Sequence, residues 1–249
     1  MTRAAQSPGD QTPRLILASA SPRRRELVAL LGLPFDVLTA PIDERPREGE
    51  TADGLACRLS QKKAHAVACL VGESPAWILA ADTVVVHNRE MLGKPVDRAQ
   101  AREYLTVLRD TAHEVVSGVT LLNALTFTQR TETYRTRVRM RAYSEPELLA
   151  YLESGDAMDK AGAYAIQHEA FHPVASLEGC YANVMGLPLC MVQRMLIEAT
   201  GWALPALPET CGRALGSACA VPLGTFDHAS SSHQPLRLVA RPQALPAKG

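Results

Sequence analysis

Residues 77–86 read Trp-Ile-Leu-Ala-Ala-Asp-Thr-Val-Val-Val. A short apolar run that is rich in β-branched residues predicts a buried strand. Asp82 interrupts this run, and a carboxylate inside a buried strand is destabilising unless it is paired, binds a metal or faces a cleft. Two interpretations stay open. Asp82 is a functional group with a perturbed pKa, as a general base or metal ligand, or it ends the strand and caps the next turn.

The segments around this strand alternate between helical and strand patterns. An apolar run at 14–18 predicts another buried strand, and the Ser-Pro pair at 21–22 begins a helix that ends at Gly32. Further helices are predicted at 52–70, 97–108, 145–154 and 189–200, and further strands at 35–39, 91–92, 114–125 and 131–141. We expect the last two strands to pair antiparallel. This order predicts a mixed α/β fold.

The composition limits the classes of protein to which the chain can belong. Its 249 residues carry 26 basic and 26 acidic side chains, so no net charge attracts nucleic acid or an anionic membrane, and an anionic ligand needs a local cluster. The six cysteines form no C-x-x-C pair and no zinc-ligand spacing. We find neither a signal peptide nor an apolar run of the roughly 20 residues that span a membrane. These features predict a cytoplasmic protein with reduced thiols.

The chain divides into three predicted parts. Residues 1–13 are polar and form a flexible N-terminus, and residues 14–204 form one folded domain. Six of the 17 prolines fall in residues 205–249, together with the run Ser230-Ser231-Ser232. Such a composition predicts a disordered tail rather than a second domain.

The first chemical signal is the turn at 19–24, which reads Ser-Ala-Ser-Pro-Arg-Arg between a buried strand and the start of a helix. Free backbone N–H groups, the helix dipole, serine hydroxyls and a guanidinium all favour an anion there. The alternative is an ordinary serine cap followed by solvated arginines.

Two lysines and one glutamine add weaker signals. Lys94 lies between Gly93 and Pro95, shortly after the central strand, and Lys63 lies on the predicted helix at 52–70. Either lysine is also explained as a surface residue. Gln167 follows the polar loop at 159–164, and its amide offers the donor and acceptors that reading a base edge requires. The alternative is a packed loop amide.

Taken together, these motifs resemble the Maf family of nucleoside triphosphate pyrophosphatases. The resemblance runs from about residue 14 to residue 200 and includes Asp82-Thr83, Gly93-Lys94-Pro95, the Asp-Lys-Ala-Gly-Ala-Tyr run at 159–164, and the Gly-Leu-Pro-Leu run at 186–189. It implies a fold related to inosine triphosphate pyrophosphatases, with an elongated mixed sheet flanked by helices and two lobes around a cleft. It also implies a homodimer.

The resemblance assigns roles to residues at matching positions. It implies that Asp82 is the catalytic base, that Ser19 and Arg23 bind the anion, and that Glu44, Lys63 and Lys94 are charged groups of the cleft. The branch that acts on dTTP and UTP carries Thr after the Asp and Gln in the late loop, as Thr83 and Gln167 do here. A branch that acts on 7-methyl-GTP has a different pattern and is the alternative substrate class.

The reaction that follows is attack of water on the α-phosphorus of dTTP, UTP or a modified pyrimidine triphosphate, which releases the monophosphate and pyrophosphate. Negative charge on the phosphate oxygens calls for cations, here Arg23, Lys63 and Lys94. A divalent cation, Mg²⁺ or Mn²⁺, is expected on Glu44 and Asp82.

Two segments depart from the family pattern. The family usually reads Leu-Ser-Gly-Arg with His two residues on, and only Leu108 and His113 remain of it here. After Gln167 the family is rich in glycine, whereas residues 168–170 are His-Glu-Ala, whose Cβ atoms restrict the backbone. These departures leave a second hypothesis open, a nucleotide-binding regulator of cell division with weak or no catalysis.

Overall fold

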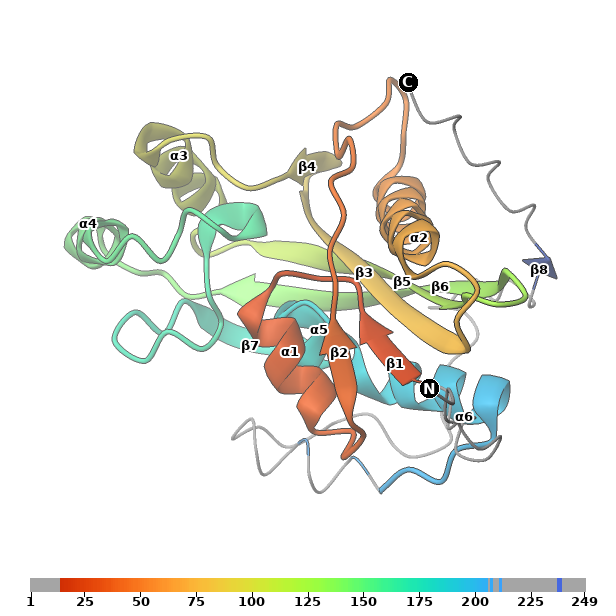
Figure 1. Cartoon of the computed structure of the whole chain (residues 1–249). Coiled ribbons are helices and arrows are strands. Elements are labelled where there is room, and N and C mark those ends of the chain that lie inside the picture. The colour runs from red at the N-terminus through yellow and green to blue at the C-terminus, as the bar shows by residue number, and fades with distance from the viewer. Residues whose placement is uncertain (1–13, 206, 208–210, 212–236, 239–249) are drawn as a thin grey trace, which may run out of the picture.

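The computed structural model describes residues 14–205, 207, 211 and 237–238. One mixed sheet runs through the molecule in the order β2-β1-β3-β5-β6-β7, with β4 on β3 and β8 on β6 (Figure 1). Only β1 pairs in parallel, with β2 and β3. The strands are β1 (Arg14–Leu17), β2 (Phe35–Val37), β3 (Ala76–His87), β4 (Glu90–Leu92), β5 (Ala112–Asn123), β6 (Thr128–Met140), β7 (Val174–Glu178) and β8 (Arg237–Leu238).

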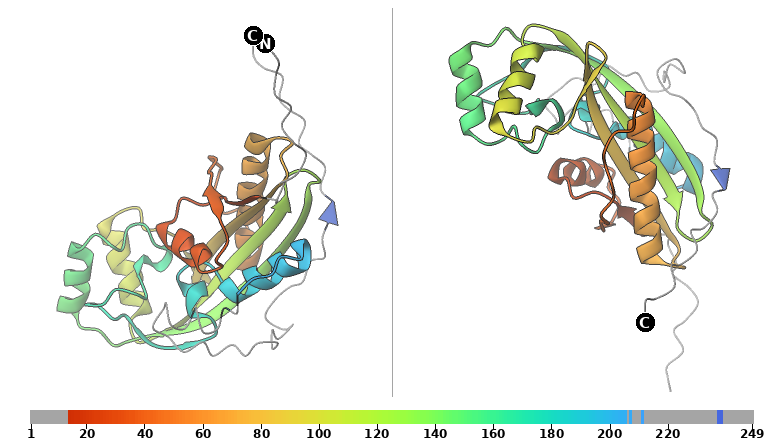
Figure 2. Two further views of the ribbon diagram at one scale, coloured as in Figure 1. Left: turned by 60° about the horizontal axis from the view of Figure 1, so that its bottom comes forward. Right: turned by 90° about the horizontal axis from the view of Figure 1, so that it is seen from above.

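Helices cover both faces of this sheet and build a second lobe at one end (Figure 2). α2 packs on one face, and α1 and α6 on the other. α3, α4 and the 3₁₀ turn η1 enclose a separate apolar cluster in the second lobe. The helices are α1 (Pro22–Ala29), α2 (Ala52–Val71), α3 (Arg98–Leu108), α4 (Glu145–Glu153), η1 (Ala161–Ala163), α5 (Tyr181–Val184) and α6 (Leu189–Thr200). The predicted mixed α/β sheet flanked by helices is confirmed.

Local signals account for most element boundaries. The Ser21 side chain accepts the N–H of Arg24 at the start of α1, and Asp97 does the same for Gln100 at the start of α3. The predicted antiparallel pairing of β5 with β6 is confirmed. Three short elements, η1, β7 and α5, lie where the sequence analysis predicts no helix or strand.

The termini are described only in part. The predicted flexible N-terminus, 1–13, and most of the predicted tail lie outside the described residues. Two residues of the tail, Leu207 and Cys211, are buried in the cluster beneath α1 and α6. Residues 237–238 form β8, which pairs with β6.

A gap in strand pairing decides where a site forms. β1 and β4 both pair with the β3 edge that faces away from β5. On β3, the residues paired with β1 end at Leu79 and those paired with β4 start at Val85. Within the described part of the chain, no strand pairs with that edge at residues 80–84, a stretch that we call the notch. Asp82 lies inside the notch, in the middle of the twelve-residue β3. The interpretation of Asp82 as a strand-ending cap is therefore wrong.

The helix α2 lies unusually close to the sheet behind the notch. Asp82 pairs across the sheet with Gly118, and a Cβ atom on Gly118 would lie 2.4 Å from the Ala56 carbonyl group. Only glycine allows the helix backbone to approach β5 so closely. This approach brings Lys63, two turns further along α2, within reach of Asp82.

We expect Gly118→Ala to lower the free energy of unfolding by about 3 kcal/mol, because α2 must shift outward to admit the methyl group. Urea denaturation measures the change. Gly93→Ala is the matched control, since an added Cβ there meets nothing within 4 Å. Equal stability of the two variants would show that α2 has room to move.

Candidate active site

A cleft of about 610 Å³ opens at the notch, between the two lobes. Its walls come from the turn before α1, from α2, from the notch itself and from the loop that contains η1. The structure brings together all eight site residues predicted from the sequence. They are Ser19, Arg23, Glu44, Lys63, Asp82, Thr83, Lys94 and Gln167.

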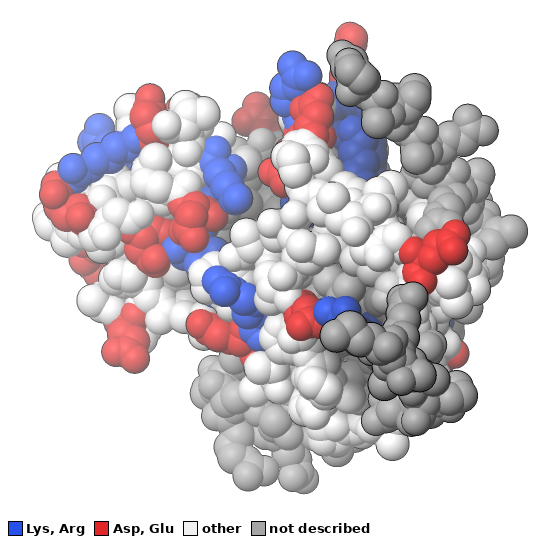
Figure 3. Space-filling view, viewed as in Figure 1, with Lys and Arg blue, Asp and Glu red and all other residues white. Residues whose placement is uncertain are grey.

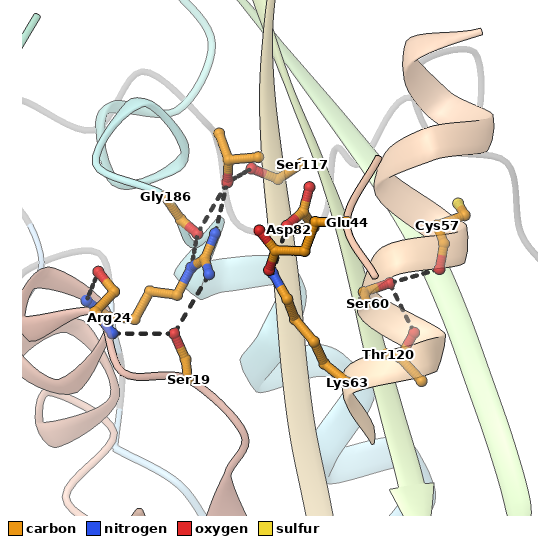
Figure 4. Close-up of polar contacts among 12 residues, drawn as sticks. Ser19, Arg24, Glu44, Cys57, Ser60, Lys63, Asp82, Ser117, Thr120 and Gly186 are labelled. Carbon is orange, nitrogen blue, oxygen red and sulfur yellow. Dashed lines mark hydrogen bonds and ion pairs between the residues drawn. The ribbon is translucent and has the colours of Figure 1, made fainter. Parts of the chain in front are cut away.

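The ammonium group of Lys63 lies between two carboxylates (Figure 4). Its Nζ is 2.6 Å from Asp82 Oδ1 and 2.8 Å from Glu44 Oε1. Lys63 and Asp82 are mostly buried, with 16% and 13% of their side-chain surfaces exposed, so the pair provides the compensation that a carboxylate in a strand interior requires. Burial alone would raise the pKa of Glu44, but Lys63, with help from Lys94 and Arg24, outweighs it and lowers that pKa.

Arg24 reaches the notch from the other side of β3, and the sequence analysis did not select it. Its guanidinium donates to the Gly186 carbonyl at 2.8 Å, to Thr83 Oγ1 at 3.1 Å and to Ser19 Oγ at 3.3 Å. Burial lowers the pKa of Arg24, with Asp82 opposing the shift, yet a guanidinium remains protonated at neutral pH. The side chain is therefore a fixed positive group at the wall of the cleft.

Thr83 holds this arginine rather than projecting freely into the cleft. Its hydroxyl shares a hydrogen bond of 2.8 Å with Ser117 and contacts the Gly186 carbonyl at 3.3 Å. Because side chains alternate along a strand, Thr83 and Asp82 point to opposite faces of β3, and each meets a different cation. The notch exposes both faces to one cleft.

The predicted anion-binding Arg23 lies at the mouth of the cleft. Its guanidinium is 3.6 Å from the carboxylate of Asp159 in the second lobe. Lys160 binds Asp159 at 2.6 Å, and only 6% of the Lys160 side chain is exposed. This chain of charges connects α1 of one lobe to the loop of the other.

Two further groups that the sequence analysis did not select support that loop. Tyr164 lines the cleft, and its hydroxyl lies 2.7 Å from Nε2 of His113 on β5. Burial lowers the pKa of His113 to about 4, so the imidazole is neutral at pH 7. The neutral pair positions the loop without adding charge to the cleft. In the sequence, His113 is a remaining residue of the family pattern and Tyr164 ends the run at 159–164, but neither pattern indicates that the two side chains meet.

The residues present fit a divalent cation that is shared with a substrate. Among the described residues no group of three or more His, Cys, Asp and Glu side chains could hold a metal. Glu44 and Asp82 nevertheless direct their carboxylates at one common cation, the Lys63 ammonium. Mg²⁺ typically takes one or two protein carboxylates and completes its shell with phosphate and water.

The model of the family described as Maf-like protein matches residues 14–199 of the chain. The chain belongs to the Maf-like family. A dTTP/UTP pyrophosphatase of Myxococcus xanthus is 47% identical over 79% of this chain and 96% of its own length. Proteins of the same name from Pelotomaculum thermopropionicum and Geobacter sulfurreducens are 43% and 42% identical, over 73% and 72% of this chain and 94% and 93% of their own lengths. Among solved structures, a HAM1 protein from Coxiella burnetii aligns at 14% identity with a TM-score of 0.44, over 75% of this chain and all of that one.

The departures of this Maf-like chain from the family pattern lie outside the cleft. Residues 109–112 and 168–170 are not among those that line it. Asp110 stands where the family usually has glycine and adopts a left-handed conformation with φ of 54°, which aspartate tolerates better than most residues. Residues 168–170 have no positive φ, so their side chains impose no strain there.

The surface of this Maf-like protein reflects its balanced charge. On the face shown in Figure 3, basic and acidic side chains are interspersed and no broad area carries one sign. The cleft, in contrast, is lined by five basic residues: Arg23, Arg24, Lys63, Lys94 and Lys160. None of the helices within residues 14–205 is long and apolar enough to cross a membrane.

We expect Lys63→Met to lower the free energy of unfolding at pH 7 by about 2 kcal/mol, because it leaves two neighbouring carboxylates without their ammonium. The folded-state pKa of Glu44 lies below its ordinary value of 4.5. The stability that this pairing contributes is therefore present above pH 4.5 and disappears as the pH falls through the folded-state pKa.

Urea denaturation at pH 7 and at pH 3.5 measures both effects, and the difference between wild type and variant should shrink at the lower pH. Lys62→Met, one residue earlier on α2, is the control. A pH-independent difference would contradict the assignment to the ion pair.

Proposed function

We propose that this Maf-like chain is a nucleoside triphosphate pyrophosphatase that hydrolyses dTTP and UTP to the monophosphate and pyrophosphate. One observation carries the proposal: a carboxylate in the middle of β3 faces a cleft that five basic side chains also line. Three relatives that are 42–47% identical bear the name dTTP/UTP pyrophosphatase, and the cleft residues discussed above match the chemistry of that name.

We assign Asp82 as the general base that orients and deprotonates the attacking water. Lys63 binds its Oδ1, so Oδ2 is the oxygen that orients the water and accepts its proton as the new bond to the α-phosphorus forms. The ion pair with Lys63 fixes the direction of the carboxylate. Breaking the bond between the α-phosphorus and its bridging oxygen releases pyrophosphate.

The cations of the cleft stabilise the charge that accumulates on the phosphate oxygens. Arg24 is held in place by three acceptors, so it is oriented before substrate arrives and loses little freedom on binding. Arg23 and Lys94 are less constrained and are suited to the terminal phosphates near the mouth. When a triphosphate enters, its oxygens replace the carboxylate of Asp159 at Arg23.

Glu44 and Asp82 are the residues that would hold a divalent cation, since Mg²⁺ typically takes one or two protein carboxylates. Such a cation would supply Lewis-acid polarisation of phosphate oxygens. In the structure both carboxylates contact the Lys63 ammonium. We assign recognition of the pyrimidine to Gln167, whose amide combines donors with an acceptor at the far wall of the cleft.

The enzyme is favoured over a non-catalytic regulator because the departures that suggested a regulator lie outside the cleft lining. The presence of both Thr83 and Gln167 in the chain favours pyrimidine triphosphates over 7-methyl-GTP as substrates. A homodimer and a cytoplasmic location stay predictions.

We expect Asp82→Asn to reduce turnover of dTTP and UTP by about 10²- to 10⁴-fold, because an amide cannot accept the proton of the attacking water. Pyrophosphate release from a panel of triphosphates, including 7-methyl-GTP, measures it. Asp43→Asn, an exposed neighbour of Glu44 that pairs with Arg45, should retain wild-type turnover. Near wild-type turnover in Asp82→Asn would reject the mechanism, and nucleotide binding by wild type without pyrophosphate release would favour the regulator.

Removal of divalent metal with EDTA should abolish pyrophosphate release, and Mg²⁺ or Mn²⁺ should restore it. Glu44→Gln should raise the Mg²⁺ concentration needed for half-maximal activity by about tenfold, because one of the two carboxylates is lost. Asp43→Asn should leave that concentration unchanged. Full activity in EDTA would show that the cations of the chain suffice.

A further inference from the structure

The turn that follows Gln167 is closed by a side chain rather than by glycine. Nδ1 of His168 accepts the backbone N–H of Phe171 at 3.0 Å. The backbone of His168 donates to the Ala165 carbonyl at 3.2 Å and accepts from His172 at 2.9 Å. An acceptor that binds the N–H three residues later is the arrangement by which Ser, Asp and Asn cap a turn or helix. Here an imidazole supplies it.

The imidazole is also packed against the second lobe. It meets the ring of Tyr151 on α4 edge-on, with centroids 4.8 Å apart and an interplanar angle of 83°. Tyr151 stacks on Phe171 at 4.4 Å, so the residue whose N–H is bound is itself fixed by the same ring. The Tyr151 hydroxyl accepts the N–H of Ala165 at 3.1 Å. Both ends of the turn are therefore attached to one buried tyrosine.

Gln167 lies between these two attachments. Its side chain is exposed and lines the cleft. A glutamine side chain loses substantial rotamer freedom when it binds a ligand. A fixed backbone reduces this cost, because fewer orientations of the amide are accessible before binding. The positive φ in this segment falls on His172, at 40°, outside the stretch next to Gln167. The His168 bond thus replaces the glycine-rich turn typical of the family.

We propose that His168 is a positioning residue that sets the direction of the Gln167 amide and thereby the preference for pyrimidine over purine triphosphates. The proposal rests on the proposed function and deepens it, because it names the residue that makes Gln167 selective. His168 itself does not line the cleft.

The test compares His168→Ala, which removes the acceptor, with His168→Asn, whose amide oxygen can accept the same N–H. Glu169→Ala, an exposed neighbour, is the control. Pyrophosphate release from UTP and GTP gives kcat and KM, and thermal unfolding reports folding. For His168→Ala we expect KM for UTP to rise about tenfold with kcat within about twofold, and the UTP-to-GTP ratio of kcat/KM to fall about tenfold.

Recovery of the wild-type KM and ratio by His168→Asn would support the proposal, since a merely structural role would alter the melting temperature without a selective rise in KM. Equal KM and ratio in His168→Ala and Glu169→Ala would overturn it, and so would an equal defect in the Ala and Asn variants. If the wild-type protein releases no pyrophosphate, the proposed function fails. Calorimetric binding of a non-hydrolysable UTP analogue then decides on His168: about tenfold weaker binding by the Ala than by the Asn variant supports the proposal, and equal binding overturns it.

Discussion

One ammonium group makes the centre of this molecule possible. Asp82 lies in the middle of a strand with 13% of its side chain exposed, and Lys63 binds it at 2.6 Å. A pair buried to this degree contributes little more to stability than well-packed apolar residues of the same volume would. What the pair achieves is a carboxylate of fixed direction in an apolar strand. For Lys63 to reach Asp82, α2 must lie close to the sheet, and Gly118 permits that approach.

The opening in front of this pair follows from the shortness of two strands. β1 has four residues and ends where the chain turns into α1, and β4 has three and forms a tight hairpin with β3. Asn88 and Arg89 both have positive φ, at 49° and 70°, as a tight two-residue hairpin turn requires. A longer strand on either side would cover the notch. Because β1 ends at the cleft, the start of α1 and its arginines lie there too.

The sequence was informative where a local pattern is unusual in itself. A single acid in an apolar run identifies Asp82 without any other information, and capping residues predict where α1 and α3 begin. β7 was not predicted because it has no continuous apolar face, and each of its five residues is either partly buried or exposed. The choice among Arg23, Arg24 and Arg25 was not available from the sequence either. Arg24 is selected by the carbonyl of Gly186, which lies 162 residues away in the chain.

Thr83 also shows that the sequence does not reveal which side chains are in contact. Its position after Asp82 is visible in the sequence, and the family resemblance associates it with a substrate class. The hydroxyl nevertheless contacts Arg24, Ser117 and Gly186, so its effect on a nucleotide passes through the arginine that it holds. A pattern of residue identities identifies which positions matter, but only the fold shows which of them touch one another.

At the two departures from the family pattern, named side chains hold the backbone where the family usually has glycine. Glycine in a motif often marks a conformation rather than a requirement for that residue. At position 110 the chain adopts a left-handed conformation with an aspartate, which Arg139 binds at 2.8 Å. After Gln167 the chain avoids the left-handed region until His172 and closes the turn with an imidazole. Loss of glycine at these places therefore changes what holds the backbone and leaves the cleft lining intact, so a motif departure must be judged by where its side chain goes.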